Sequence, residues 1–293
     1  MTSRSPAPSP KDWRRHLAAH VFEESLILTG SAGRYQLEIG DTWEGQRGKA
    51  YGGFAAAAVL RAAGLMSSAS RPASFTCQFL RPVALMVPCQ FDVASLRRGR
   101  TSDLLSVSVS QSGKPALHGL VRTVDESTGP ESQPARRPVL VDPTSLPRDV
   151  DVMRSYGWRA SKLAQYIECR MDMDTAAAGG HTAWQRLGEG IVYDDPFLEA
   201  GRYLMLLDNA APAIVNQAGY FWGPRRKELP WGFANLDLLV HFHVAKGTDW
   251  LFMDSEVITG SGGLSSAQTQ VWSDSAELLA TSISQIHFLP ITG

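Results

Sequence analysis

Asp237 is the side chain whose setting most strongly suggests a function. It stands in the segment ANLDLLVHFH, between Leu236 and Leu238 at the head of an apolar strand pattern. Strands are depleted in Asp, and burying a carboxylate is costly unless a partner or a purpose compensates the cost. Asp237 is therefore a candidate functional carboxylate. The structural alternative is an Asp that caps a turn at the end of a strand.

The dipeptide Gly52-Gly53, preceded by Tyr51, begins a helix pattern and is a candidate anion site. The first N–H groups of a helix have no partner within the helix, and the positive end of the helix dipole favours negative charge. Glycine also permits close approach of a carbonyl group to the backbone. The structural alternative is a tight turn into the helix, and both interpretations can hold together.

Other reactive residue types lack the partners that their chemistry requires. His241 and His243 share one strand face but show no third metal ligand. Ser261 lacks the Gly-x-Ser-x-Gly elbow of α/β-hydrolases, because position 259 is Thr. We therefore expect no metal site and no Ser-His-Asp hydrolase.

Composition limits the function classes that need to be considered. The chain has 293 residues, 44% hydrophobic, with 28 Lys and Arg against 29 Asp and Glu. A net charge of −1 gives no electrostatic signature of nucleic-acid or anionic-membrane binding, and no stretch reaches the ~18 apolar residues of a membrane span. With no such charged surface, we expect the ligand to bind in a pocket. Three cysteines without CxxC spacing favour a reducing compartment, so we expect a cytoplasmic protein.

The elements that must position these residues occur twice, in the same order. A helix over 52–66 contains the four alanines 55–58 and no charge over 54–60, which predicts a helix buried on all sides. Period-2 strands follow at 74–80, 89–97, 102–110 and 116–124. A second helix over about 198–215 precedes strands at 235–244, 250–258, 264–272 and 278–288.

Matching positions in the two copies keep a nearly constant offset of 162 to 164 residues. The matched pairs are Phe79 with Phe242, Gly99 with Gly263, and Leu117 with Leu279. The repeat predicts an α+β protein of two fused units, each a buried helix wrapped by a twisted antiparallel sheet. We expect a flexible leader over 1–19, a first unit over 20–128, a Pro-rich linker and connecting segment over 129–184, and a second unit over 185–293.

The motifs GKAYGGFAAAAVLRAA, SFTCQFLRPV, RRGRTS and NLDLLVHFHV, together with LLATSISQ, resemble the double-hotdog acyl-CoA thioesterases, in particular the thioesterase II type. The resemblance covers about residues 30–290. It implies two fused hotdog units, with an acyl-CoA or acyl-carrier thioester bound in the cleft between them. It further implies hydrolysis to the free acid and the thiol without a cofactor, and it leaves assembly into homo-oligomers open.

The resemblance also implies roles for individual residues. In such enzymes an Asp, a Thr or Ser and a Gln hold the attacking water, and these roles match Asp237, Thr259 and Gln285. Ser261 ranks narrowly behind Thr259. Gly52 and Gly53, with Tyr51 before them, would bind the substrate and its oxyanion, although relatives often carry His before the two glycines.

Two features depart from the expected pattern or compete with it. Gln285 falls one residue later than expected, so Ser284 takes the nominal position, and neighbouring strand residues face opposite sides of a sheet. A β-bulge would restore Gln285. Asp208, in LLDNAAP on the second helix, is the runner-up base, because a helix carboxylate is catalytic in some other hotdog thioesterases.

Two other functions stay open at this point. The shifted Gln285 and the Tyr before the glycines are compatible with a catalytically degenerate protein that binds acyl thioesters. A hydratase or dehydratase acting on an enoyl thioester would need a paired acid and His. Asp237 with His241 is the pair that the sequence offers.

Overall fold

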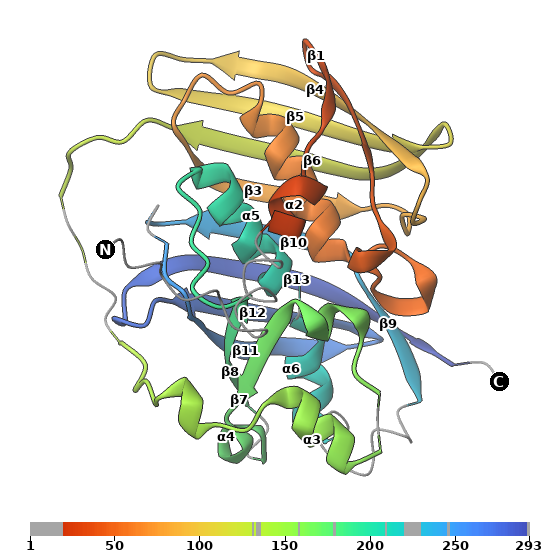
Figure 1. The fold of residues 1–293 in the computed structure, drawn as a ribbon, viewed down its shortest axis with the longest axis vertical. Coiled ribbons are helices and arrows are strands. Elements are labelled where there is room, and N and C mark those ends of the chain that lie inside the picture. The colour runs from red at the N-terminus through yellow and green to blue at the C-terminus, as the bar shows by residue number, and fades with distance from the viewer. Residues whose placement is uncertain are drawn as a thin grey trace, which may run out of the picture.

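The strands of both halves join in one antiparallel sheet of thirteen strands (Figure 1). The computed structural model describes residues 20–130, 132, 136–157, 159–177, 180–208, 210–219, 230–244 and 247–291. The predicted leader over 1–19 lies outside the described residues. The strand order is β1-β2-β4-β5-β6-β3-β10-β13-β12-β11-β8-β7, and β9 also pairs with β13.

Strand bounds follow the predicted segments closely in the first half and less closely in the second. The first half contains β1 (Thr29–Ser31), β2 (Arg34–Glu38), β3 (Arg71–Phe79), β4 (Pro88–Arg98), β5 (Ser102–Gln111) and β6 (Lys114–Val124). The second half contains β7 (Ile167–Met171), β8 (His181–Leu187), β9 (Trp231–Asn235), β10 (Asp237–Phe242), β11 (Leu251–Ser261), β12 (Leu264–Trp272) and β13 (Leu278–Pro290).

The two halves meet where β3 pairs with β10, and the repeat is visible in this pairing. Thr76 lies opposite Leu239, and Phe79 and Phe242 each end their strand. Because the paired strands are antiparallel, the two copies are related by an approximate two-fold axis near Thr76 and Leu239. The fold is therefore α+β with two similar halves, as the repeat predicts.

Three of the helices below, α2, α5 and α6, pack against one face of this sheet, whereas α3 and α4 lie at its end beside β7 and β8. The helices are α2 (Gly52–Gly64), α3 (Asp149–Ser155), α4 (Met173–Ala177), α5 (Pro196–Leu207) and α6 (Ala210–Gln217), with 3-10 turns η1 (Asp41–Trp43), η2 (Gln46–Gly48), η3 (Pro143–Ser145) and η4 (Lys162–Gln165). Residues 53–60 of α2 are all buried, which confirms the burial predicted from its alanines. In Figure 1, α2 and α5 lie together over the centre of the sheet. None of the helices within the described ranges is long and apolar enough to cross a bilayer.

The second helix segment is broken, where the sequence pattern predicts one helix over 198–215. α5 ends at Leu207, and α6 begins at Ala210. Pro212 has no N–H, so it cannot donate to the carbonyl of Asp208 one turn earlier. That carbonyl instead accepts a hydrogen bond from the hydroxyl of Tyr51, at 3.1 Å. The break places Asp208 at the end of α5.

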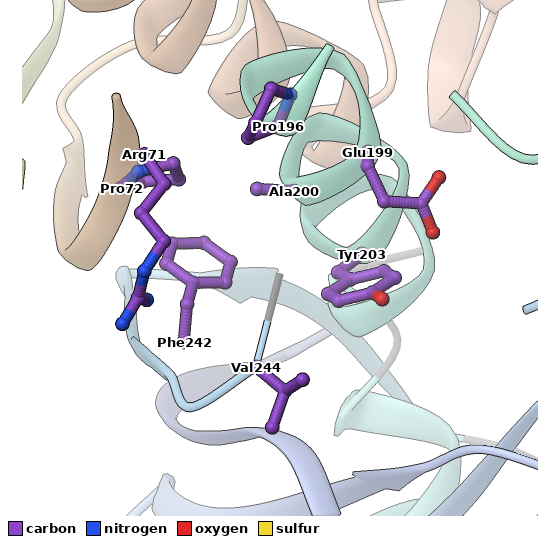
Figure 2. Close-up of a pocket in the computed structure, with 8 residues that line it drawn as sticks. All are labelled: Arg71, Pro72, Pro196, Glu199, Ala200, Tyr203, Phe242 and Val244. Atoms are coloured by element: carbon purple, nitrogen blue, oxygen red, sulfur yellow. The ribbon is translucent and has the colours of Figure 1, made fainter. Parts of the chain in front are cut away.

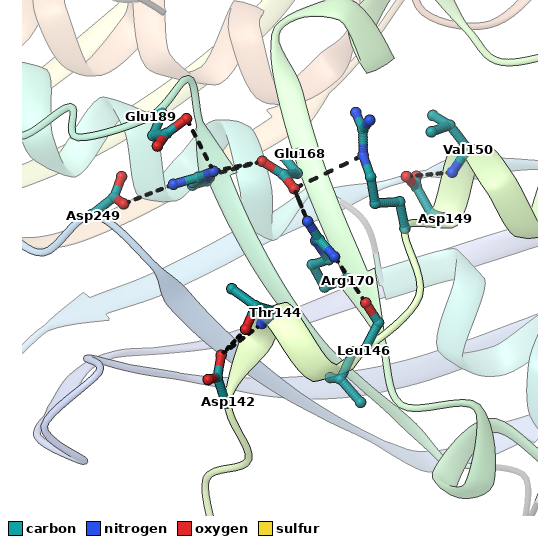
Figure 3. A network of polar contacts seen from close by, with 11 residues as sticks. Asp142, Thr144, Leu146, Asp149, Val150, Glu168, Arg170, Glu189 and Asp249 are labelled. Carbon is teal, nitrogen blue, oxygen red and sulfur yellow. Dashed lines mark hydrogen bonds and ion pairs between the residues drawn. The ribbon is translucent and has the colours of Figure 1, made fainter.

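An ion-pair network joins β7 and β8 to the segment before β11 (Figure 3). Arg186 contacts Glu168 at 2.7 Å and Asp249 at 2.9 Å, and its guanidinium lies 4.2 Å from the ring centroid of Trp250. These contacts attach both strands to the second half. The predicted boundary at residue 185 falls within β8, and the division into units stays a prediction.

Candidate active site

Three chain segments meet at the carboxylate of Asp208. Asp208 follows α5, and its carboxylate accepts hydrogen bonds from the backbone N–H of Gly53, at the start of α2, and from the side-chain amide of Asn235, at the end of β9. These residues are far apart in the sequence and come from both halves of the chain. The carboxylate therefore lies at the junction between the halves.

Glycine is required at this junction because the helices approach each other so closely. A Cβ atom on Gly53 would lie 2.7 Å from the carbonyl oxygen of Met205, and one on Gly52 would lie 2.5 Å from Oδ2 of Asp208. Contacts below 3.0 Å at backbone atoms cannot form without a shift of the helices. The two glycines thus bring the positive end of the α2 dipole against the carboxylate.

Burial raises the pKa of Asp208 to about 7, although the hydrogen bonds from Asn235 and Gly53 partly offset that rise. A carboxyl group that ionises near neutral pH is present partly as the base and partly as the acid under physiological conditions. Asp208 therefore has the proton affinity that general acid–base catalysis needs.

Tyr51 supports the same residue from the side of α2. Its hydroxyl donates to the backbone carbonyl of Asp208, and burial together with the nearby carboxylate raises the pKa of the tyrosine. The tyrosine is therefore a neutral donor. The predicted substrate-binding residues Gly52, Gly53 and Tyr51 all gather around Asp208.

Ser284 adds a buried hydroxyl on the helix-facing side of the sheet. It is 1% exposed, and its Oγ has no hydrogen-bond partner among the described residues. Ile286, which follows Ser284 by two residues on β13, lies opposite Asn235. The side chain of Asn235 is hydrogen-bonded to Asp208. Ser284 and Asn235 therefore project from the same face of the sheet, toward the helices.

The predicted catalytic residues of the second half lie on the opposite face. The carboxylate of Asp237 accepts a 2.8 Å hydrogen bond from the backbone N–H of Gln285. Asp237 also pairs across the strands with the exposed Gln78, whereas its neighbour Leu238 is buried under the helices. Asp237 and Gln285 are thus together, but they are separated from Asp208 by the thickness of the sheet.

Thr259 and Ser261 lie further out on the sheet. Thr259 is opposite Ser266, which is opposite Gln285, so Thr259 lies two strands from Gln285, about 10 Å away. Both Thr259 and Ser261 are exposed, and Ser261 pairs with Leu264 beside the hairpin turn. The structure does not bring these hydroxyls to Asp208.

Asn235 was not among the residues expected from the sequence. In the sequence pattern it is only the first residue of a predicted strand, two residues before Asp237. The one-residue shift at Gln285 points more clearly to the site. It puts Ser284 at the position where the family pattern has Gln, and Ser284 faces the helices.

The other end of the two helices is chemically different. There Asp195 accepts hydrogen bonds from the N–H groups of Phe197 and Leu198, and it forms a 2.6 Å ion pair with Arg61. The residue directly after α2 is Leu65, whereas the residue directly after α5 is Asp208. A small pocket lies nearby, lined by Arg71, Pro72, Pro196, Glu199, Ala200, Tyr203, Phe242 and Val244 (Figure 2). The approximate two-fold symmetry therefore does not extend to the chemistry.

No cluster of three His, Cys, Asp or Glu arranged to hold a metal ion is found in the described part of the chain. His241 is exposed on the outer face, and Nε2 of His243 is hydrogen-bonded to the hydroxyl of Thr281 at 3.1 Å.

Two family models match this chain. The model of the acyl-CoA thioesterase N-terminal domain matches residues 39–124, and that of the acyl-CoA thioesterase C-terminal domain matches residues 142–286. The chain belongs to the acyl-CoA thioesterase family. It is therefore a thioester hydrolase by family, as the sequence motifs indicated.

Solved structures show the hotdog fold. A hotdog-fold protein from Alicyclobacillus acidocaldarius superposes with a TM-score of 0.77 at 17% identity, covering 93% of this chain and 99% of the other. The acyl-CoA thioesterase II TesB2 of Mycobacterium marinum gives 0.74 at 19% identity, covering 93% and 99%. A putative thioesterase II from Thermobifida fusca gives 0.75 at 19%, covering 92% and 97%. A comparison with curated proteins found no match.

Proposed function

We propose that this chain hydrolyses acyl-CoA thioesters at the junction of α2 and α5, with Asp208 as the general base. The observation that carries the proposal is the buried carboxylate of Asp208, held between the N–H of Gly53 and the amide of Asn235. Burial gives this carboxyl a pKa of about 7, so it can both accept and return a proton.

The reaction requires one proton to be moved and one oxyanion to be stabilised. Asp208 takes a proton from water as the water oxygen bonds to the thioester carbon. The carbon–sulfur bond then breaks, and the CoA thiolate leaves and takes the proton from Asp208. Acid and thiol together contain all the atoms of thioester and water.

The surrounding groups would orient the water and stabilise the developing charge. Asn235 fixes one oxygen of Asp208. Ser284 offers a buried hydroxyl, without a partner among the described residues, to the water or to the thioester carbonyl. The start of α2 at Gly52 offers backbone N–H groups and a positive dipole end to the oxyanion.

The water-binding group expected from the resemblance, Asp237 with Thr259 and Gln285, is the competing proposal for the base. Asp208 is favoured because it lies with Gly52 and Gly53 on the helix-facing side of the sheet. Asp237 instead receives its hydrogen bond on the outer face, next to Gln285.

The test measures thiol release from octanoyl-CoA by the wild type, Asp208→Asn and Asp237→Asn. It distinguishes the two candidate bases. Loss of a general base lowers kcat by roughly 100-fold or more. We expect a loss of that size in Asp208→Asn and at least a tenfold smaller loss in Asp237→Asn. The reverse order would transfer the role to Asp237. Asp92→Asn, an exposed substitution on β4, controls for handling of the variants.

The same assay addresses the two other functions. Wild-type protein that binds octanoyl-CoA without releasing thiol would be a degenerate thioester-binding protein. Addition of water to crotonyl-CoA without thiol release would identify a hydratase. Either result would overturn the hydrolytic proposal.

A further inference from the structure

A small pocket lies between the end of α5 and the inner face of the second half of the sheet. Its lining comes from α5 and strands β8, β11 and β12, which lie close together in Figure 1. The lining residues are His181, Gln185, Leu206, Leu207, Met253, Ser255 and Thr269. Four of these seven residues are polar, although all seven lie in the protein interior.

Strand pairing places the polar residues in one row. His181 lies opposite Ser255, Ser255 opposite Thr269, and Thr269 opposite Ser282. Residues that are directly opposite share a face of the sheet, and all four are buried. Four adjacent strands therefore present hydrogen-bonding groups to the interior at the same level.

At the matching level of the first half, the described residues are apolar. There Phe75 lies opposite Val121, and Val121 lies opposite Leu105, all three of them fully buried and apolar. Both halves cover a similar helix, so packing alone does not require polar groups in this layer. The row of four belongs to the half that supplies Asp208, whereas the buried polar pair of the first half, Asp103 opposite Thr123, is bonded to Ser68 and Ser67.

Buried hydroxyls cost free energy unless they are hydrogen-bonded. Ser255 and Thr269 bond to each other at 2.8 Å, which leaves each oxygen with further capacity. Groups with unused hydrogen-bonding capacity at a pocket favour a polar occupant.

The pocket is adjacent to the proposed base. Leu206 and Leu207 line it, and Asp208 is the next residue of the chain. At 1.5 Å of helix rise per residue, the pocket begins within about one helical turn of Asp208. An acyl chain whose thioester is at Asp208 would have this pocket within reach.

The charges around the pocket select among polar occupants. None of its lining residues is Lys or Arg, and burial lowers the pKa of His181 to about 4, so this histidine is neutral near neutral pH. A carboxylate would therefore find no cation and would be repelled by ionised Asp208. A neutral hydroxyl finds both donors and acceptors.

We infer that the pocket is the acyl subsite for a hydroxyl group, and that the preferred substrates are hydroxyacyl thioesters rather than plain alkanoyl thioesters. The inference rests on the proposed hydrolysis at Asp208. A site built to bond a hydroxyl discriminates strongly against the analogue that lacks it, whereas an apolar pocket rejects an added hydroxyl only weakly.

The test compares octanoyl-CoA with hydroxyoctanoyl-CoAs that carry the hydroxyl at the third, fifth or last carbon. We expect at least one hydroxy isomer to have a kcat/KM on the order of tenfold or more above that of octanoyl-CoA. Thr269→Val and Ser255→Ala should bring this ratio toward one while octanoyl-CoA is still hydrolysed. Thr123→Val, at an equally buried threonine of the first half, should leave the ratio unchanged.

Binding of the same thioesters to Asp208→Asn, measured by calorimetry, separates this inference from the proposed function. Asp208→Asn should bind a hydroxy isomer with a lower Kd than octanoyl-CoA, and the Asp208→Asn/Thr269→Val double variant should lose this difference. That result would support the subsite even if the wild type hydrolysed nothing. Hydrolysis of octanoyl-CoA at a kcat/KM equal to or above that of every hydroxy isomer would overturn the subsite and leave the proposed function intact. Absence of both binding and hydrolysis would overturn both.

Discussion

The side-chain amide of Asn235, at the end of β9, donates to Oδ1 of Asp208, at the end of α5. This bond joins the sheet to the helix junction at the carboxylate. It also lowers the pKa that burial has raised. Asn235 is therefore expected to tune the acidity of Asp208 as well as to orient it.

Asn235→Ala should move the acidic limb of the pH profile of kcat/KM to higher pH. Without the amide donor, the ionised form of Asp208 loses stabilisation, so the pKa of Asp208 rises. Steady-state rates between pH 5 and 9 measure the shift. Thr281→Ala, whose hydroxyl bonds to His243 on the outer face, is the control and should keep the wild-type profile. An acidic limb that stays in place would mean that Asp208 does not control the rate.

Asp208→Asn should stabilise the protein at alkaline pH. The folded-state pKa of Asp208, about 7, exceeds the ordinary 3.8, so the native state holds this proton more tightly than the unfolded state does. Stability that Asp208 contributes at low pH is therefore lost as the pH rises from 3.8 toward 7. Relative to wild type, the variant should gain about 2 to 4 kcal/mol at pH 8, and the gain should shrink on acidification to pH 5. Urea unfolding at both pH values measures it, and equal differences at the two would contradict it.

Gly53→Ala should destabilise the protein by about 1 to 3 kcal/mol and reduce thiol release. The added Cβ would lie 2.7 Å from the carbonyl oxygen of Met205 and 2.8 Å from its Cα, so α2 and α5 must separate at the proposed site. Thermal unfolding and activity are measured together. Gly40→Ala is the matched control, because a Cβ there meets nothing within 4 Å. Equal stability of the two variants would show that the helices accommodate the methyl group.

The fold was largely predictable from the sequence, for a physical reason. Period-2 alternation reports directly which face of a strand is buried, and β12 occupies the predicted 264–272. The charge-free run of alanines in α2 likewise reports a helix without a solvent face. Both patterns involve residues close together in the sequence, so the sequence alone is enough to predict these elements.

The candidate site was less predictable, because it depends on relationships that the local pattern does not contain. Whether residue 284 or 285 faces the helices depends on register, and a single step reverses the face. The break after α5 depends on Pro212, which removes one backbone donor. Asp208 was recognisable as a carboxylate on the second helix, but its contact with Gly53 arises only from the packing of two distant helices.

The buried pair of Glu199 and Arg202 on α5 should make a single substitution more damaging than a double one. Arg202 is fully buried, and it also donates to the backbone carbonyls of Thr248 and Asp249, which attaches the segment before β11 to the helix. Arg202→Met leaves Glu199 buried without its cation, and breaking such a pair costs about 3 to 5 kcal/mol. In Arg202→Met/Glu199→Gln the charge is absent, so part of that loss should be recovered. Urea unfolding of the three proteins checks this order. A double variant less stable than Arg202→Met would show that Glu199 stabilises the fold through its contacts with the N–H of Tyr193 and the hydroxyl of Tyr203.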